Sequence, residues 1–331
     1  MTTLSVLVGT VVTVGMFWVV PTGLALLDGP RPPGWDPLRR AWPLFAVPGA
    51  LALWLPRSGL STGLAAVYAL ATLALALQAP ARLILTRSLA PGEVAVLTAL
   101  VAPSVAGLAL VAERASYPLF GFDLDILALT VPHFHFAGFA AALVAGLLCR
   151  VADGPTARFA ALSVPAGTLL VLLGYFVDDW AELLGAVVLT AGMTAVAVLT
   201  LRERRTLAAD RLTRGLLAVS ALVLFVTMLL ALSWAVGEAT GLPHLDLTWT
   251  AATHGLGNAL GFAVCALLAH RRLRADQPAP VPPSAHHLTT PKVPTVPTNP
   301  IVRTDPAVPT NPRVPTNPAH PTADPRTELP A

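Results

Sequence analysis

Hydrophobic residues are grouped into long runs over the first 270 positions, and short polar segments separate these runs. A run of about 20 apolar residues can cross the hydrocarbon core of a bilayer as a helix. We identify nine such runs, of which the second is short and contains Pro43 and Pro48. The pattern predicts an all-α, polytopic transmembrane helical bundle of about nine spans. Their approximate limits are 4–27, 41–55, 59–78, 93–112, 126–149, 158–178, 180–201, 215–237 and 248–270.

The pattern changes after Arg274, because proline fills 16 of the last 57 positions. Proline lacks the amide hydrogen that helices and sheets use, and this segment has few large apolar residues to bury. We therefore predict a transmembrane helical domain over residues 1–274 and a disordered, proline-rich cytoplasmic tail over residues 275–331. The tail either recruits a protein partner or serves as a solvated spacer.

Composition and charge agree with a membrane protein. Hydrophobic residues make up 55% of the chain and charged residues 12%, with a mean hydropathy of +0.68, whereas soluble domains carry about 25% charged residues. Fifteen arginines lie in loops that follow odd-numbered spans, and only Arg57 and Arg114 follow even-numbered ones. Because positive residues favour the cytoplasm, we expect the N-terminus outside and the C-terminus inside. The net charge of +3 reflects this orientation and does not support nucleic-acid binding.

Three histidines lie inside the predicted spans. They are His133 and His135 in the fifth span and His254 in the ninth. Polar side chains are costly in hydrocarbon, so they usually face the bundle interior and mark a site. At a rise of 1.5 Å per residue, His133 and His254 both lie about 10 Å below the outer boundary. This shared depth predicts a common site.

Helix geometry limits which histidines can meet. His133 and His135 are two positions apart, so about 200° separates them on a regular helix. We expect His135 to face His254, because small residues that favour close helix crossing follow both, while Asn258 orients His254 through a hydrogen bond. In the alternative, a kink at Pro132 turns His133 inward. The small or polar residues are Gly138, Ala142 and Gly146 after His135, and Asn258, Gly261 and Cys265 after His254.

The predicted outer face is acidic, and this favours attraction of cations or protons toward the site. Glu182 is the strongest individual candidate, because it lies just inside the seventh span, and Glu113 is a second candidate. The acidic residues of this face are Glu113, Asp123, Asp125, Asp178, Asp179, Glu182, Glu238 and Asp246.

These residues leave three functions open. The first is transport of an ion, proton or small solute past the histidines. The second is a metal- or haem-binding membrane oxidoreductase with His135 and His254 as ligands, although an H-x-H pair on a helix does not place both rings on one face. The third is a scaffold that acts through its tail. The sequence names no cofactor, and whether the protein is an enzyme stays open.

Two motifs carry a family resemblance. The segment Leu129-Thr-Val-Pro-His-Phe-His-Phe-Ala-Gly-Phe139 resembles the Leu-Thr-x-x-His-Phe-His-Tyr-Ala-Gly-Phe pattern of the YndJ-like bacterial membrane proteins. The segment His254-Gly-Leu-Gly-Asn-Ala-Leu-Gly-Phe262 is similar to that family's His-Gly-x-x-Asn-Ala-x-Gly-Phe. Phe136 replaces the usual tyrosine. The resemblance implies a multi-pass protein of the bacterial inner membrane and carries over His133, His135, His254 and Asn258 as site residues.

Overall fold

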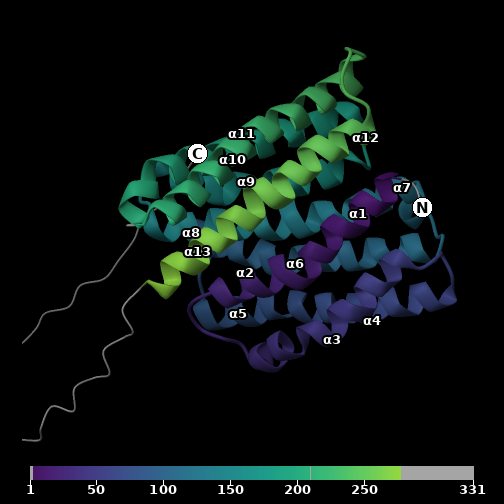
Figure 1. The fold of residues 1–331 in the computed structure, drawn as a ribbon, viewed down its shortest axis with the longest axis horizontal. Helices are drawn as coiled ribbons and strands as arrows, with labels where there is room; N and C mark the ends of the chain where they lie inside the picture. The colour runs from purple at the N-terminus through teal and green to yellow at the C-terminus, as the bar shows by residue number, and fades with distance from the viewer. Residues whose placement is uncertain (1–2, 209, 277–331) are drawn as a thin grey trace, which may run out of the picture. The chain divides into compact units, whose positions relative to one another are not determined.

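The computed structural model describes residues 3–208 and 210–276, and within these ranges the chain forms helices and no strand (Figure 1). The described helices belong to one unit that comprises residues 1–279. The predicted all-α bundle is therefore confirmed. The predicted tail, 275–331, lies outside the described residues beyond Asp276, so its disorder and the domain boundary stay predictions.

Eight helical stretches are long and apolar enough to cross a membrane, judged by length and composition. Three of these eight stretches contain π-helical turns. The first of the eight joins α1 (Thr3–Val14), η1 (Gly15–Val19) and α2 (Val20–Leu26). The others are α4–α5 (Gly59–Ala76, Gln78–Thr86), α6 (Pro91–Arg114), α7–η3–α8 (Leu124–His133, Phe134–Ala141, Ala142–Val151), α9 (Pro155–Gly174), α10 (Asp179–Leu207), α11 (Arg211–Thr240) and α12–η4–η5–α13 (Leu247–Thr250, Ala251–Gly255, Gly257–Val264, Cys265–Ala275). A short 3-10 turn, η2 (Leu119–Gly121), precedes α7.

The remaining predicted span, 41–55, lies within helix α3 (Trp35–Trp54) except for its last residue. This helix begins earlier than predicted, and its first turns carry Asp36, Arg39 and Arg40. These charges lower its average apolarity, which is why it is not among the eight. It still runs the length of the bundle alongside α4 (Figure 1).

Helix α6 carries a carboxylate near each end, and two arginines hold each one. Glu93 binds Arg82 at 2.9 Å and Arg150 at 3.0 Å. At the opposite end, Glu113 binds Arg57 at 2.8 Å and also its neighbour Arg114. We call these the Glu93 end and the Glu113 end of the bundle.

Backbone contacts extend both ends across the bundle. Arg82 also donates to the carbonyl oxygens of Asp28 and Pro30, which precede α3. Arg114 donates to the carbonyl oxygens of Ala52 and Leu55, where α3 ends. The cluster at the Glu93 end therefore joins α5 and α6 to the segment before α3, and the cluster at the Glu113 end joins α6 to the end of α3.

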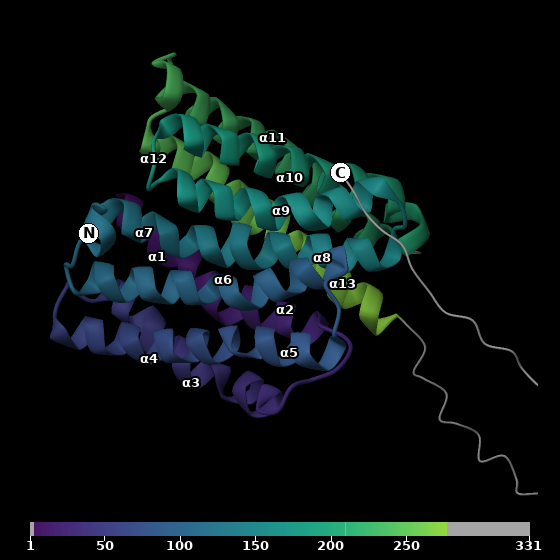
Figure 2. The same cartoon turned by 180° about the vertical axis from the view of Figure 1, so that it is seen from behind.

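The α7–η3–α8 helix is the central element of the bundle, and it is the most buried of the eight stretches. It contacts α6, α9, the α1–η1–α2 helix and η5 (Figures 1 and 2). On one side, Gly138 faces Ala102 of α6 and Gly146 faces the backbone of Gly92. The helix that carries the His133-Phe-His135 motif is thus enclosed by neighbours on every flank.

Helices α9 and α10 pack closely through glycines spaced seven residues apart. An added Cβ at Gly167 or Gly174 of α9 would lie 2.5 Å from backbone atoms of α10. Gly185 and Gly192 of α10 face α9 in the same way. Small residues allow such backbone approach between membrane helices. This contact holds the wall of helix α10 in place beside the site described below.

We predict that Gly185→Ala destabilises the protein by about 1–3 kcal/mol, because its methyl group would meet the backbone of Val171 and overpack the interface. The thermal midpoint of the purified protein in detergent measures this effect. Gly215→Ala on α11 is the matched control, since no heavy atom lies within 4 Å of its added Cβ. Equal midpoints for the two variants would show that the α9–α10 contact is looser than described.

Candidate functional site: a cavity between the helices

A cavity of about 220 Å³ lies between α1, the α7–η3 helix, α10, α11 and the α12–η4–η5 helix. Its walls are mostly apolar, and a few polar side chains project into it. Ligand sites in proteins commonly have this composition. The principal apolar lining residues are Val11, Phe136, Met193, Met228, Trp234 and Phe262.

Two polar atoms in the cavity wall have no hydrogen-bond partner among the described residues. They are Nε2 of His133 and Oγ1 of Thr190, and both atoms are buried. Thr190 is 7% exposed. A buried polar group without a partner costs about 1–3 kcal/mol, so such atoms are uncommon and call for an explanation. Here both atoms belong to residues that line one cavity.

His254 lies in the opposite wall, and its neighbours fix its orientation. Its Nδ1–H donates to the carbonyl oxygen of Thr227 at 2.8 Å. Nε2 is then the acceptor in the neutral ring, and the Asn258 amide donates to it at 3.3 Å. The Thr227 hydroxyl also donates to Asn258 Oδ1 at 2.9 Å. The predicted contact of Asn258 with His254 is present, but the carbonyl of Thr227 sets the tautomer.

Glu182 lines the cavity nearer the start of α10, and Tyr175 also lines it, close to the Glu182 carboxylate. On α10 the lining residues follow helical spacing, from Glu182 through Ala186 and Leu189 to Met193. Glu182 and the start of α10 lie toward the Glu113 end of the bundle. The carboxylate therefore lies in the part of the cavity nearer the Glu113 end, which we call the mouth, and Thr190 lies farther along α10.

His135 does not line the cavity. It is fully buried against α4, where the Tyr68 hydroxyl donates to Nε2 at 2.6 Å and Nδ1–H donates to the Val131 carbonyl at 2.7 Å. Trp42 packs edge-on against Tyr68 and donates to the Met16 carbonyl. Both nitrogens of His135 are thus occupied.

The expected pairing of His135 with His254 is wrong. His133 instead shares the cavity with His254, close enough for charges on the two rings to interact. The two histidines of the motif do face different directions, as the spacing predicted. The choice of His135 rather than His133 rested on small residues that were expected to bring the two helices together. Those after His135 instead pack on α6, while Gly257 and Gly261 face Val223 and Thr227 of α11.

Glu113 was expected in the site but lies elsewhere. It is buried at the end of α6 between Arg57 and Arg114, which leaves it a structural role in the ion pairs that join α3, α4 and α6. The two arginines of the predicted outer face are therefore both committed to one carboxylate.

The metal-site alternative gains no support from the geometry. In the described part of the chain, no group of three or more His, Cys, Asp or Glu side chains could hold a metal ion. His135 and His254, the ligands expected under that alternative, also contact different partners. A site that uses the tail would lie outside the described residues.

The sequence analysis missed three contributors to the cavity: Thr190, Tyr175 and Trp234. A signal for Thr190 was available, because it follows Glu182 by eight residues and so lies near the same face of a helix. Threonine is common in membrane helices, however, and only the structure shows that its hydroxyl lacks a partner. Tyr175 and Trp234 were ordinary aromatic residues in the sequence.

The helices and the cavity define a multi-pass membrane protein with a polar site enclosed by its bundle. The family model of the YndJ-like proteins matches residues 10–262. The chain belongs to this family, as the two histidine motifs predicted. Searches of the curated proteins and of the solved structures found no match.

One titratable residue beside the mouth lies outside the spans. His244, in the loop between α11 and α12, packs against Trp234 of the cavity wall. Its Nδ1–H donates to the Leu242 carbonyl at 3.0 Å, and its Nε2 contacts the Glu238 carboxylate at 2.7 Å. These contacts, the carbonyl first, raise the pKa of His244 above its ordinary value. The ring therefore ties the loop to α11 most strongly when it is protonated.

We predict that the 241–246 loop opens more readily as pH rises. A raised folded-state pKa gives stabilisation that is fully present below the unfolded pKa of about 6.5 and is lost as pH rises through the folded value. Hydrogen exchange of this loop, corrected for the intrinsic pH dependence, measures the opening. His244→Gln should abolish the pH dependence. Wild-type protection that stays constant through this range would contradict the role of His244.

Proposed function

We propose that this protein binds a small solute in the cavity and transports it across the bacterial inner membrane. The single observation that carries the proposal is that His133 and Thr190, which line one apolar cavity, each have a buried side-chain atom, Nε2 and Oγ1, without a partner among the described residues. Unsatisfied polar atoms are unfavourable in an empty site. A solute with its own donor and acceptor would satisfy both.

The surroundings of these two atoms support a binding site rather than a packing defect. His254 and Asn258 complete a polar layer across the cavity, and their own hydrogen bonds hold them in place. Groups held by such secondary contacts are preorganised and lose little freedom when a ligand arrives. The lining thus combines an apolar body with a few convergent polar groups, as ligand pockets do.

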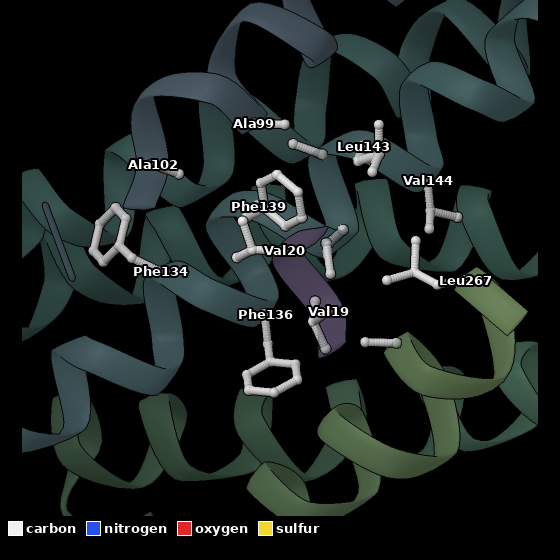
Figure 3. Close-up of a cluster of buried hydrophobic side chains, with 14 of the residues drawn as sticks. Val19, Val20, Ala99, Ala102, Phe134, Phe136, Phe139, Leu143, Val144 and Leu267 are labelled. Atoms are coloured by element: carbon white, nitrogen blue, oxygen red, sulfur yellow. The ribbon is translucent and has the colours of Figure 1, made fainter. Parts of the chain in front are cut away.

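The position of the cavity supports transport rather than binding alone. Toward the Glu93 end the path is filled by fully buried apolar side chains. Figure 3 shows this cluster, which brings Val19, Val20, Phe139, Leu143 and Leu267 together from three helices. The π-helical segments adjoin both: η3 and η5 contribute Phe136 and Phe262 to the cavity wall, and η1 and η3 contribute Val19 and Phe139 to the cluster. Such π turns frequently mark functional positions in helices. Rearrangement at these turns would open the cavity to the second side.

The orientation of the protein in the membrane is part of the same proposal. The arginine-rich loops lie at the Glu93 end, so positive residues favour that end in the cytoplasm. The cavity then opens toward the outside, with the N-terminus outside and the C-terminus inside. Transport would carry the solute between this opening and the cytoplasmic end through the apolar cluster.

Thr190→Val tests the binding site, because valine keeps the shape of threonine and removes the unpartnered hydroxyl. We expect a thermal midpoint equal to or above that of the wild type, since no existing hydrogen bond is lost. Binding of a neutral fluorescent probe, N-acetyl-dansylcadaverine, to protein in nanodiscs should weaken about fivefold, because a hydrogen bond contributes about 1 kcal/mol. Thr200→Val on the same helix is the control, since Thr200 already bonds to Val196 and lies outside the cavity. Unchanged probe binding in Thr190→Val would remove Thr190 from the site.

Thr190→Cys distinguishes transport from binding alone. In a background of Cys149→Ser and Cys265→Ser, a membrane-impermeant thiol reagent should label Thr190→Cys from either side of sealed vesicles, because a transporter exposes its site to each side in turn. Thr168→Cys, which is buried outside the cavity, is the control and should stay unlabelled. Labelling of Thr190→Cys from one side only would favour a receptor or binding protein.

A further inference from the structure

The charge of the cavity wall has one sign. Among the described residues that line the cavity, Glu182 is the only carboxylic acid, and no arginine or lysine is present. When it is ionised, this partly buried carboxylate disfavours an anionic ligand, since like charges repel more in a medium of low dielectric constant. The wall therefore selects against carboxylates, phosphates and sulfates.

The surroundings of the mouth strengthen this selection. Asp179 and Glu238 lie close enough to Glu182 to interact with it electrostatically, and of these two Glu238 is itself paired with His244. The two arginines of the Glu113 end are both bound to Glu113, which does not line the cavity. They do not neutralise Glu182. Clefts with charges of one sign and apolar walls concentrate ligands of the opposite sign.

The walls do not suit an inorganic cation. Metal ions and alkali ions need several oxygen or nitrogen ligands in place of water, whereas Phe136, Met193 and Met228 offer apolar surface. Aromatic rings beside a carboxylate instead suit an organic cation, because ring faces attract positive charge. Trp234 and Tyr175 both line the cavity, and Tyr175 lies close to Glu182.

The polar atoms of Thr190 and His133 add a second requirement for the ligand. Thr190 follows Glu182 by eight residues on α10, so its unpartnered hydroxyl lies about 12 Å deeper along the helix axis. Thr190 is 7% exposed, and its hydroxyl has no partner in the described part of the chain. His133 Nε2 is unpartnered in the same cavity. A ligand that satisfies all three groups has a charge at one end and a hydrogen-bonding group about 12 Å away.

We infer that the solute is an amphipathic organic monocation, such as a primary or secondary amine with an apolar body. Its ammonium group lies at Glu182, its apolar part lies between Met193, Met228 and Trp234, and its far end forms hydrogen bonds with Thr190 and His133. This inference rests on the proposed function, because it names the class of solute that occupies the same cavity.

Three probes with one dansyl fluorophore and similar linkers test the charge preference. Dansylcadaverine carries an ammonium group, N-acetyl-dansylcadaverine is neutral, and 6-(dansylamino)hexanoate is an anion. Each is titrated into full-length protein in phosphatidylcholine nanodiscs, with empty nanodiscs as background. We expect the wild type to bind the cation at least tenfold more tightly than the neutral probe, and the anion more weakly than both.

Glu182→Gln should bring the affinity for the cation down to that for the neutral probe. Glu203→Gln is the matched control, because it makes the same change on the same helix outside the cavity, and it should keep the tenfold preference. Equal binding of cation and neutral probe by the wild type would overturn the inference, as would a preference that survives Glu182→Gln.

The same titrations separate this inference from the proposed function. If the neutral probe binds and Thr190→Val weakens it, but the ammonium gives no advantage, the cavity remains a binding site and the organic-cation assignment falls. If no dansyl probe binds to the protein above the empty nanodisc, the assignment and the proposed binding of this size of solute fall together.

Discussion

The rotation of the central helix depends on the hydrogen bonds of His135. Tyr68 donates to one ring nitrogen, and the other donates to the Val131 carbonyl. Hydrocarbon offers no substitute for these partners, so a rotation that broke them would leave buried polar atoms unsatisfied. With His135 fixed toward α4, His133 points to the other side of the helix and into the cavity. His135, which has no chemical task in the proposed function, thus positions His133, which lines the cavity.

The π-helical segments contribute to the same arrangement. A π turn changes the regular pairing of backbone groups, and side chains can then use the carbonyl oxygens that become available. Trp42 donates to the Met16 carbonyl within η1, and His135 donates to Val131 next to η3. Irregular backbone at membrane depth is tolerated where protein groups satisfy it. The site therefore lies where three neighbouring helices depart from regular geometry.

Much of the fold followed from the sequence, because hydrocarbon imposes long apolar runs that are easy to recognise. The contact of Asn258 with His254 and the exposure of Glu182 to the site also followed, from helical spacing and from charge near a span end. The direction in which the His135 side chain points did not follow from the sequence. Small residues such as Gly138 and Gly146 predict close approach but do not name the neighbour, and α6 proved to be that neighbour. The roles of Glu113 and Thr190 depend on whether a partner is present, and that information exists only in three dimensions.

The two carboxylate clusters of α6 also define a length. Glu93 and Glu113 are twenty residues apart, so about 30 Å separates them along the helix, which matches the hydrocarbon thickness of a typical bilayer. Ionised clusters resist entry into hydrocarbon, and a bilayer that is too thick or too thin must deform or tilt the protein. Helix α6 therefore sets the vertical register of the bundle in its membrane, and lipid thickness becomes a variable that controls how deep the cavity lies below the surface.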